Sequence, residues 1–309
     1  MLKSKKTLTI LSFLSIAYLL ACSPKTSSDH VKSEATEANA KIVWITGDVK
    51  IQSAEGERKA EFGQSVSPAD TIITGKNGSV EIMIANSGIV KVSKDTELSV
   101  AALTSEEGAN VKVNLNYGKI VTMVRKENKN SDFRVVTPTA LAGVRGTTFL
   151  TSVENPTGGK PNCAEEHCDV KFAVLEGSVA VSKVGEDGEV ILDRNREITL
   201  KKNQKLTDKM ILSLRPESVK QLKGLIVLKK NDVLEYNNLV DELKASSEEL
   251  RILSQASTVE EARTQLQKRE ISKANADEVT KTAKEVNETK YVQQDVQKEK
   301  LKLNAKETF

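Results

Sequence analysis

Arg145 is the residue whose type and setting most directly suggest chemistry. It lies in the segment Val144-Arg145-Gly146-Thr147, with Gly143 two residues before it. A guanidinium presents a planar fork of N–H donors that fits a carboxylate or a phosphate. The segment therefore predicts one of two structures. It is either a loop that contacts a ligand through Arg145, or a strand junction in which Arg145 pairs within the fold.

Cys163, His167 and Cys168 are close in sequence and have three possible uses. Four residues separate the two cysteines, so a disulfide would close a small loop, which an extracytoplasmic setting permits. A metal site would have only three soft ligands, two of them adjacent, and no second pair elsewhere in the sequence. We expect a disulfide between Cys163 and Cys168 and no metal, with free thiols as the alternative.

No catalytic site is predicted. The two histidines are His30 and His167, and the sequence contains no Gly-x-Ser-x-Gly turn. It also contains no Gly-rich phosphate loop ending in Lys-Ser/Thr and no His-Glu-x-x-His. Acidic pairs such as Glu106-Glu107 fit a solvated loop. We therefore expect no enzyme, no catalytic residue and no cofactor. A hydrolase built from Asp and Glu alone is the alternative enzyme class.

Residues 41–205 repeat one pattern, in which a glycine precedes apolar residues at alternate positions. Alternation predicts strands with one buried face, and the glycine permits turn conformations that cost other residues more. The repeats begin at Gly47, Gly78, Gly88, Gly118, Gly177 and Gly188. We predict a mainly β domain, either a multi-strand sandwich or a solenoid-like stack, with a core of Val, Ile and Leu.

Residues 216–309 are predicted to be helical and coiled-coil-like. Positions three and four apart form an apolar seam with two polar members. The seam consists of Val219, Leu222, Ile226, Lys229, Val233, Tyr236, Val240, Leu243, Ser247 and Leu250. Ser257-Thr258-Val259-Glu260 predicts a capping box that starts a second helix. Such polar helices need a partner surface. They therefore either fold on themselves or on the β domain, or self-associate between chains.

The N-terminus predicts secretion and lipid anchoring. Residues 1–21 combine a lysine-rich start with an apolar stretch too short for a comfortable membrane span, as a signal peptide does. Leu19-Leu20-Ala21-Cys22 resembles the lipobox of bacterial lipoproteins, which implies cleavage before Cys22 and its lipidation. Residues 22–40 then comprise the lipidated cysteine and a flexible tether. We expect an envelope location at the outer membrane, on its periplasmic face or at the cell surface.

Charge argues against one class of partner. The net charge is +3 over 309 residues, and Lys and Glu are intermixed along the chain. No basic patch is segregated, so we expect no nucleic-acid partner.

Several segments of the β region resemble, in order, the FecR-type domain of bacterial envelope proteins. They are residues 44–49 (WITGDV), 63–84, 115–124, 133–153 and 172–182. The Val-Arg-Gly-Thr-x-Phe element at 144–149, together with the later Glu-Gly-x-Val, is the most specific part. The resemblance covers residues 41–185. It implies an extracytoplasmic β domain for sensing or protein contact rather than catalysis.

The resemblance also sets limits. The best-known members pass a signal from an outer-membrane receptor, through a membrane helix, to a cytoplasmic sigma-factor regulator. Here we expect no cytoplasmic N-terminal domain and no lasting membrane helix, so that regulator role is not carried over. The layout resembles envelope lipoproteins of spirochaetes and other diderm bacteria. The family keeps the Arg145 segment across unlike partners, which favours a structural role. If Arg145 is buried and paired, its loss would cost about 3–5 kcal/mol.

Together these features predict a membrane-anchored, non-catalytic module for protein binding, sensing or scaffolding in the envelope. Its expected partners are the membrane, through the lipid, and a protein of the envelope. The alternative is a surface-exposed adhesin that binds host or matrix molecules.

Overall fold

The computed structural model describes residues 40–277 apart from 86, 106–107, 127–131, 159–162, 164–167, 202 and 276. Every described residue belongs to one compact unit, Thr36–Phe309. The predicted signal peptide, Cys22, residues 23–39 of the tether and the end of the tail therefore lie outside the described residues, and Ala40, the last residue predicted for the tether, already belongs to β1.

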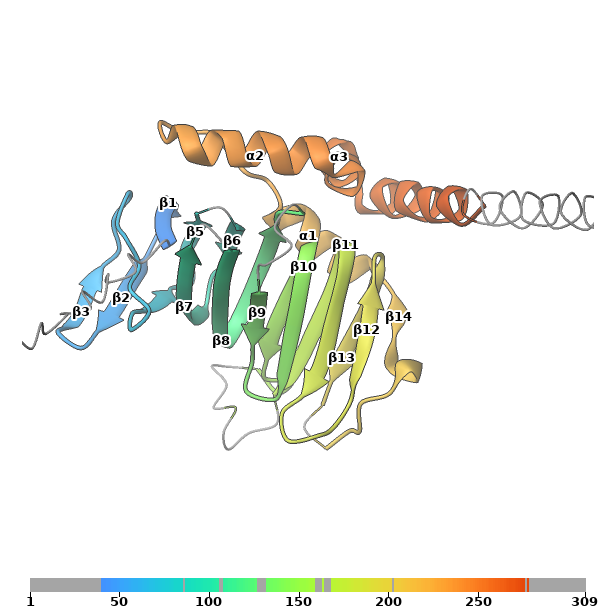
Figure 1. Cartoon of the computed structure of the whole chain (residues 1–309), viewed down its shortest axis with the longest axis horizontal. Helices are drawn as coiled ribbons and strands as arrows, with labels where there is room; N and C mark the ends of the chain where they lie inside the picture. The colour runs from blue at the N-terminus through green and yellow to red at the C-terminus, as the bar shows by residue number, and fades with distance from the viewer. Residues whose placement is uncertain are drawn as a thin grey trace, which may run out of the picture. The chain divides into compact units, whose positions relative to one another are not determined.

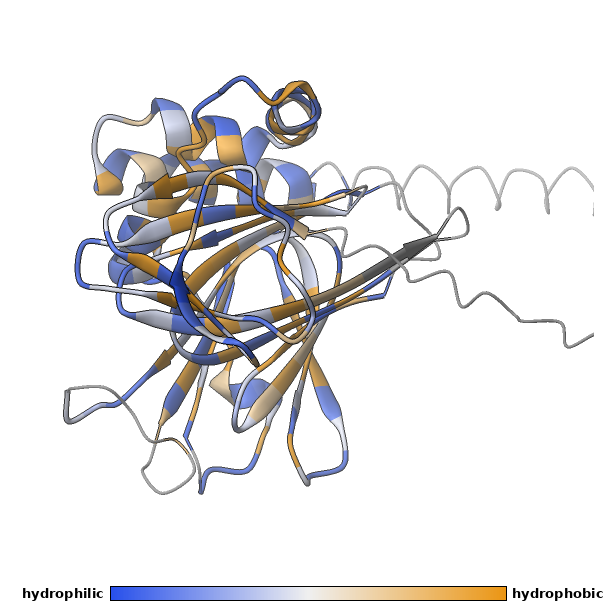
Figure 2. Cartoon of the chain, turned by 90° about the vertical axis from the view of Figure 1, so that its left-hand side faces the viewer, coloured by the Kyte–Doolittle hydropathy of each residue, from blue (hydrophilic) through white to orange (hydrophobic). Residues whose placement is uncertain are grey.

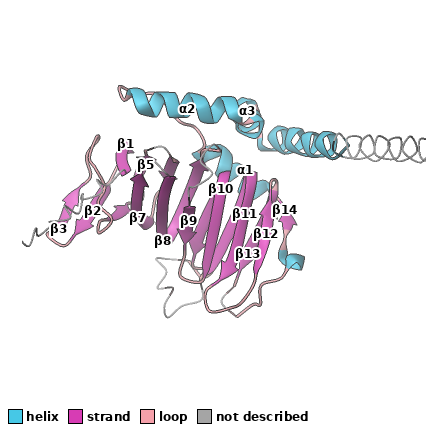
Figure 3. Ribbon diagram, in the orientation of Figure 1, coloured by secondary structure: helices cyan, strands magenta, loops and turns pink. Residues whose placement is uncertain are grey.

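The described residues form a β region followed by helices (Figures 1 and 3). The strands are β1 (Ala40–Thr46), β2 (Val49–Ser53), β3 (Gly56–Lys59), β4 (Thr71–Thr74), β5 (Ser79–Ile84), β6 (Gly88–Val92), β7 (Thr96–Ser105), β8 (Gly108–Val124), β9 (Asp132–Val136), β10 (Ala140–Glu154), β11 (Asp169–Lys183), β12 (Glu189–Asp193), β13 (Arg196–Leu200) and β14 (Leu212–Ser213). After the short 3-10 helix η1 (Asp208–Met210) come α1 (Pro216–Leu225), α2 (Leu234–Ser246), α3 (Glu248–Gln255) and a further helix over 259–275.

Three long strands belong to two layers of one sheet. The first part of β8 pairs with β7 and β9, and its second part, from Gly118, pairs with β6 and β10. β10 and β11 change partners in the same way, on either side of Gly146 and Gly177. One layer, the helix-side layer, runs β1-β5-β6-β8-β10-β11-β13-β14. The other, the open layer, runs β3-β2-β4-β7-β8-β9-β10-β11-β12. This arrangement fits the sandwich alternative.

The core between the layers is aliphatic, as predicted. Ile42 of the helix-side layer and Ile51 of the open layer belong to the same buried cluster, whose aromatic members are Phe133, Phe149 and Phe172. The sequence alternation has its expected meaning in β12, where Val190 and Leu192 are buried and their neighbours face solvent. Figure 2 shows the apolar residues alternating along the strands.

The helix-side layer is buried on both faces. Met83, Met123 and Leu150 point away from the core between the layers and join a second apolar cluster with Val219, Tyr236 and other helix residues. This explains why β5 is buried at nearly every position instead of at alternate ones. We call α1, α2, α3 and the 259–275 helix the helical cover.

The helical cover does not show the coiled-coil character predicted for the tail. The apolar members of the seam are largely buried, but they pack on the sheet, and the seam is interrupted between α1 and α2, where Lys229 and Val233 lie outside any helix. Of the predicted alternatives, residues 216–275 follow the one in which the helices fold on the β domain. Within the described part of the chain, no helix is both long and apolar enough to span a membrane.

The predicted capping box is displaced by one residue. Thr258, not Ser257, caps the last described helix, because its Oγ1 accepts a hydrogen bond from the Glu261 backbone N–H at 3.1 Å. The Glu261 carboxylate in turn accepts from the Ser257 N–H at 2.7 Å. The arrangement is close to a capping box, but the carboxylate accepts from the residue before the cap instead of from the cap itself.

A buried polar network holds the helical cover to the sheet. Glu81 of β5 and Lys91 of β6 form a 2.7 Å ion pair in which the Glu81 side chain is only 2% exposed. The Tyr236 hydroxyl of α2 donates to Glu81, and the Lys91 ammonium donates to the Val227 carbonyl at 2.5 Å. Burial, together with the hydrogen bond to the Glu81 carboxylate, raises the pKa of the Tyr236 phenol, which therefore stays a neutral donor.

We predict that Lys91→Met lowers the free energy of unfolding by about 3–5 kcal/mol, because Glu81 would keep its buried charge without a cation. Lys50→Met is the matched control, since it breaks the Lys50–Glu57 pair, whose side chains are 44% and 52% exposed. The control should lose about 0–1 kcal/mol. Urea unfolding followed by circular dichroism measures both. Equal losses would contradict the importance of the buried pair.

Candidate functional site

The Arg145 segment is not a loop. It lies inside the continuous strand β10, and the register with β11 shifts between Arg145 and Thr148. At this shift the strand bends from the open layer into the helix-side layer. The segment is therefore a strand junction, one of the two structures predicted for it.

Two glycines make the bend possible. Gly146 has φ +59°, and a Cβ there would lie 2.9 Å from the Lys126 Cα. Gly177, at the bend of β11, has φ +79°, and its Cβ would lie 2.7 Å from the Gly146 carbonyl oxygen. A side chain at either position would meet both a disfavoured backbone conformation and a neighbouring backbone. Gly143 differs, because a Cβ there would meet nothing within 4 Å.

Arg145 itself departs from the prediction of a buried guanidinium. Its side chain is exposed, on the solvent face of the open layer, next to Ser178 of β11 in the register. The large loss of stability expected for a buried arginine therefore does not apply. The strand alternation explains the difference, since Ala142 and Val144 take the inward positions.

Thr147 is the buried polar residue of the segment. Its hydroxyl lies 3.0 Å from both the Arg145 and the Ser178 carbonyl oxygens and can donate to either. It thereby satisfies backbone acceptors where the ladder is interrupted by the bend. The hydroxyl thus has a structural use at this position.

The bend is also linked to the helical cover. Lys126, just after β8, forms an ion pair with Glu176 of β11 and donates to the Ser246 carbonyl, the last residue of α2, at 3.0 Å. The Glu176 carboxylate is 12% exposed and the Lys126 side chain 48%. A single cation therefore joins the bend of β11 to the end of a helix.

A cavity of about 620 Å³, which we call the bend cavity, opens beside this junction. It lies between the bend of β11, the turn from β12 to β13 and the last described helix. Its lining comprises Lys126, Glu176, Gly177, Ser178, Asp193, Arg194, Arg196, Glu270, Lys273, Ala274 and Asp277. Arg145 adjoins it through the cross-strand row Arg145–Ser178–Asp193.

The chemistry of the bend cavity is that of charge recognition. Arg196 pairs with Glu270 at 2.9 Å, and Lys273 lies 3.7 Å from Glu249. The lining contains both cations and carboxylates, so the cavity suits a polar group or protein segment that carries both signs of charge. Over the described residues, no cluster of His, Cys, Asp and Glu is arranged to hold a metal ion.

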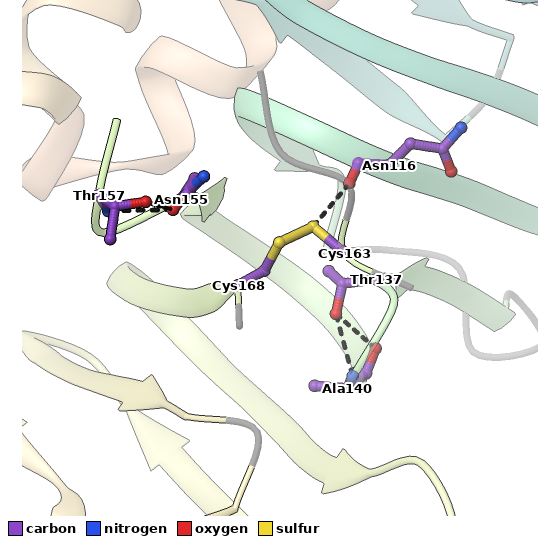
Figure 4. Close-up of a disulfide and its surroundings, with 7 residues drawn as sticks. All are labelled: Asn116, Thr137, Ala140, Asn155, Thr157, Cys163 and Cys168. Carbon is purple, nitrogen blue, oxygen red and sulfur yellow. Dashed lines mark hydrogen bonds between the residues drawn. A yellow bond between two sulfur atoms is a disulfide. The ribbon is translucent and has the colours of Figure 1, made fainter. Parts of the chain in front are cut away.

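Cys163 and Cys168 form a disulfide, the expected one of their three uses (Figure 4). Cys168 is buried in the core between the layers, and the Cys163 sulfur lies 3.8 Å from the Asn116 carbonyl oxygen. Both sulfurs are thus engaged in a covalent bond, which leaves neither as a thiolate ligand for a metal. His167 lies outside the described residues.

Sequence reasoning reached part of this site. Gly146, Thr147 and the Glu176-Gly177 element stood out by their motifs, although the motif alone did not assign Glu176 a partner. Lys126, Arg194 and Glu270 carry no sequence signal, because they meet only when β8, the β12–β13 turn and the last helix come together.

Comparisons with known proteins agree with the resemblance. Residues 70–180 match the family model described as FecR protein, which confirms the resemblance over that part of the chain. No curated protein matches the chain.

Two crystal structures of a candidate anti-sigma factor from Parabacteroides distasonis are also similar. They share 16% and 17% identity with TM-scores of 0.37, and the match covers 50% and 55% of this chain. It covers 63% of the first of those chains, less than two thirds, and 71% of the second. A likeness at this level supports no statement about function.

We predict that Gly146→Ala and Gly177→Ala each lower the free energy of unfolding by about 1–3 kcal/mol, through backbone strain and crowding at the bend. Gly143→Ala is the matched control on the same strand and should change stability by about 0.5 kcal/mol or less. Thermal unfolding monitored by circular dichroism measures all three. A Gly146→Ala protein as stable as the control would contradict the assignment of the bend.

Proposed function

We propose that this chain, whose residues 70–180 match the FecR family, is a lipid-anchored regulatory or sensing module of the bacterial envelope. It works by binding a protein partner. The FecR family is regulatory rather than catalytic, and this role fits a fold whose conspicuous motif shapes a strand junction. The anchor is the lipidated Cys22, and the tether of residues 22–40 leads to β1.

One observation carries the binding role. The most distinctive family segments, at Gly146 and Gly177, shape the wall of a charged cavity whose other wall is the helical cover. A ligand or partner that enters the bend cavity would contact the sheet and the last described helix together. Binding would then change the free energy of their contact, which is the physical requirement for a sensor.

The anchor is tested by metabolic labelling with palmitate. The full-length protein should incorporate label, whereas Cys22→Ala should not and should leave the membrane fraction. The double variant Cys163→Ser, Cys168→Ser is the control and should label like the unaltered protein. An unlabelled wild-type protein would exclude the anchor.

The binding role is tested by photo-crosslinking in intact cells. A photoreactive residue replaces Arg194, which lines the bend cavity, and in a control replaces Lys112, which is exposed on the open layer. We expect a discrete crosslinked envelope protein from position 194 that is absent from position 112. Identical products from both positions, or none, would contradict a specific partner at the cavity. Crosslinks to added matrix molecules alone would favour the adhesin alternative.

A further inference from the structure

A second cavity lies where the helical cover ends on the helix-side layer. It has a volume of about 520 Å³, and we call it the edge cavity. Its lining comprises Ser152, Glu154, Asn155, Pro156, Asp169, Lys171, Thr199, Lys201 and Arg215. It shares no lining residue with the bend cavity.

The floor of the edge cavity is a cross-strand row of polar residues. Ser152 of β10 pairs in register with Lys171 of β11, which pairs with Thr199 of β13. These residues lie on the same face as Leu150 and Ala173, which the helical cover buries. The face therefore changes from apolar to polar where α1 begins.

Ser152 is the residue that most directly suggests a ligand. It is only 1% exposed, yet it lines the cavity. Its hydroxyl makes no hydrogen bond to another described residue, and the oxygen is not among the fully buried, unsatisfied ones, so it keeps access to the cavity. The hydroxyl is therefore available to donate a hydrogen bond to a ligand oxygen in place of water.

The charges of the edge cavity favour an anion. The ammonium groups of Lys171 and Lys201 have no ion-pair partner in the described part of the chain. Arg215 pairs with the buried Glu197 and places a guanidinium N–H 3.4 Å from the Thr199 hydroxyl oxygen. That contact uses the oxygen as acceptor, so the Thr199 hydrogen stays available to a ligand.

The carboxylates of the lining do not cancel this charge. Glu154 pairs with Lys119 at 2.6 Å. Asp169, next to Glu154 in the register, is the one lining carboxylate without an ion pair among the described residues. Two available lysines thus face one available carboxylate. Directly after Arg215, α1 begins at Pro216, and the N-terminus of this ten-residue helix adds positive potential.

We propose that the edge cavity binds an oxyanion, the phosphate or carboxylate group of a ligand. Lys171 and Lys201 neutralise its charge, and the hydroxyls of Ser152 and Thr199 donate hydrogen bonds to its oxygens. The same group occurs on a soluble metabolite and on an anionic lipid headgroup, and both chemistries satisfy the site. The site is independent of the lipid anchor and of the partner at the bend cavity.

The first test uses the full-length protein and inorganic phosphate in calorimetry at low salt. We expect saturable binding that weakens about tenfold or more in the double variant Lys171→Gln, Lys201→Gln, since charge-assisted hydrogen bonds to phosphate would be lost. Ser152→Ala should weaken it by about fivefold, the equivalent of one neutral hydrogen bond. Lys112→Gln, on the open layer, is the matched control and should bind normally.

The variants should fold normally, because Lys171 and Lys201 have no ion pair to lose, and melting curves verify this. No saturable binding of phosphate, or equal weakening in Lys112→Gln, would overturn the proposal. So would unchanged binding by the double variant.

The second test separates the two sources of the anion. Cys22→Ala protein, which should lack a lipid of its own, is mixed with phosphatidylcholine vesicles with or without phosphatidic acid. If the protein binds the phosphatidic acid vesicles and the double variant Lys171→Gln, Lys201→Gln does not, the ligand is a lipid headgroup. If the protein binds phosphate but neither kind of vesicle, the ligand is a soluble molecule. Either result leaves the palmitate and crosslinking outcomes unaffected, so a failure here is distinct from a failure of the proposed function.

Discussion

The fold depends on how closely backbone can approach backbone where long strands bend between layers. At Gly146 and Gly177 the distances leave no room for a Cβ, and β8 has the same constraint at Gly118, where a Cβ would lie 2.5 Å from the Thr96 Cα. Sharing strands across bends keeps the hydrogen-bond ladder nearly continuous, so few backbone groups lose their partners. The layers also part at the bends. The bend cavity borders Gly177, and another cavity, of about 560 Å³, borders Gly118.

The helix-side layer, which the shared strands help to form, has an apolar face on each of its two sides. One face closes the core against the open layer, and the other needs a cover. The polar helices supply it, and their own apolar seam is consumed in doing so. Apolar packing alone would not fix the position of α2 on the sheet. The hydrogen bonds of the Glu81–Lys91–Tyr236 network are satisfied in only one position of the helix, so the network specifies that position. The helical cover is therefore part of the folded domain, and the bend cavity owes one of its walls to it.

Arg145 and Lys126 show how far the candidate site could be predicted. The Gly143–Gly146 segment could be interpreted as a strand junction, because apolar alternation continues on both sides of it. Whether Arg145 is exposed depends on which side of β10 meets the core. The bend shifts the strand register locally, so the alternation of the sequence alone does not give that side. Lys126 occupies an unremarkable charged stretch. Its link from Glu176 to Ser246 joins residues 50 and 120 positions away in sequence, which no local pattern encodes.

By itself, the sequence determined the β region with its alternating strands, the aliphatic core and the helical character of the tail over residues 216–275. These follow from local periodicity and from glycine and capping chemistry, which act over a few residues. Only the tertiary structure decided that strands β8, β10 and β11 serve two layers and that the helices, besides contacting one another, cover a sheet face. It also decided that charges from distant elements meet in cavities. The physical reason is that an apolar seam specifies burial but not its partner, which here is the outer apolar face of the helix-side layer.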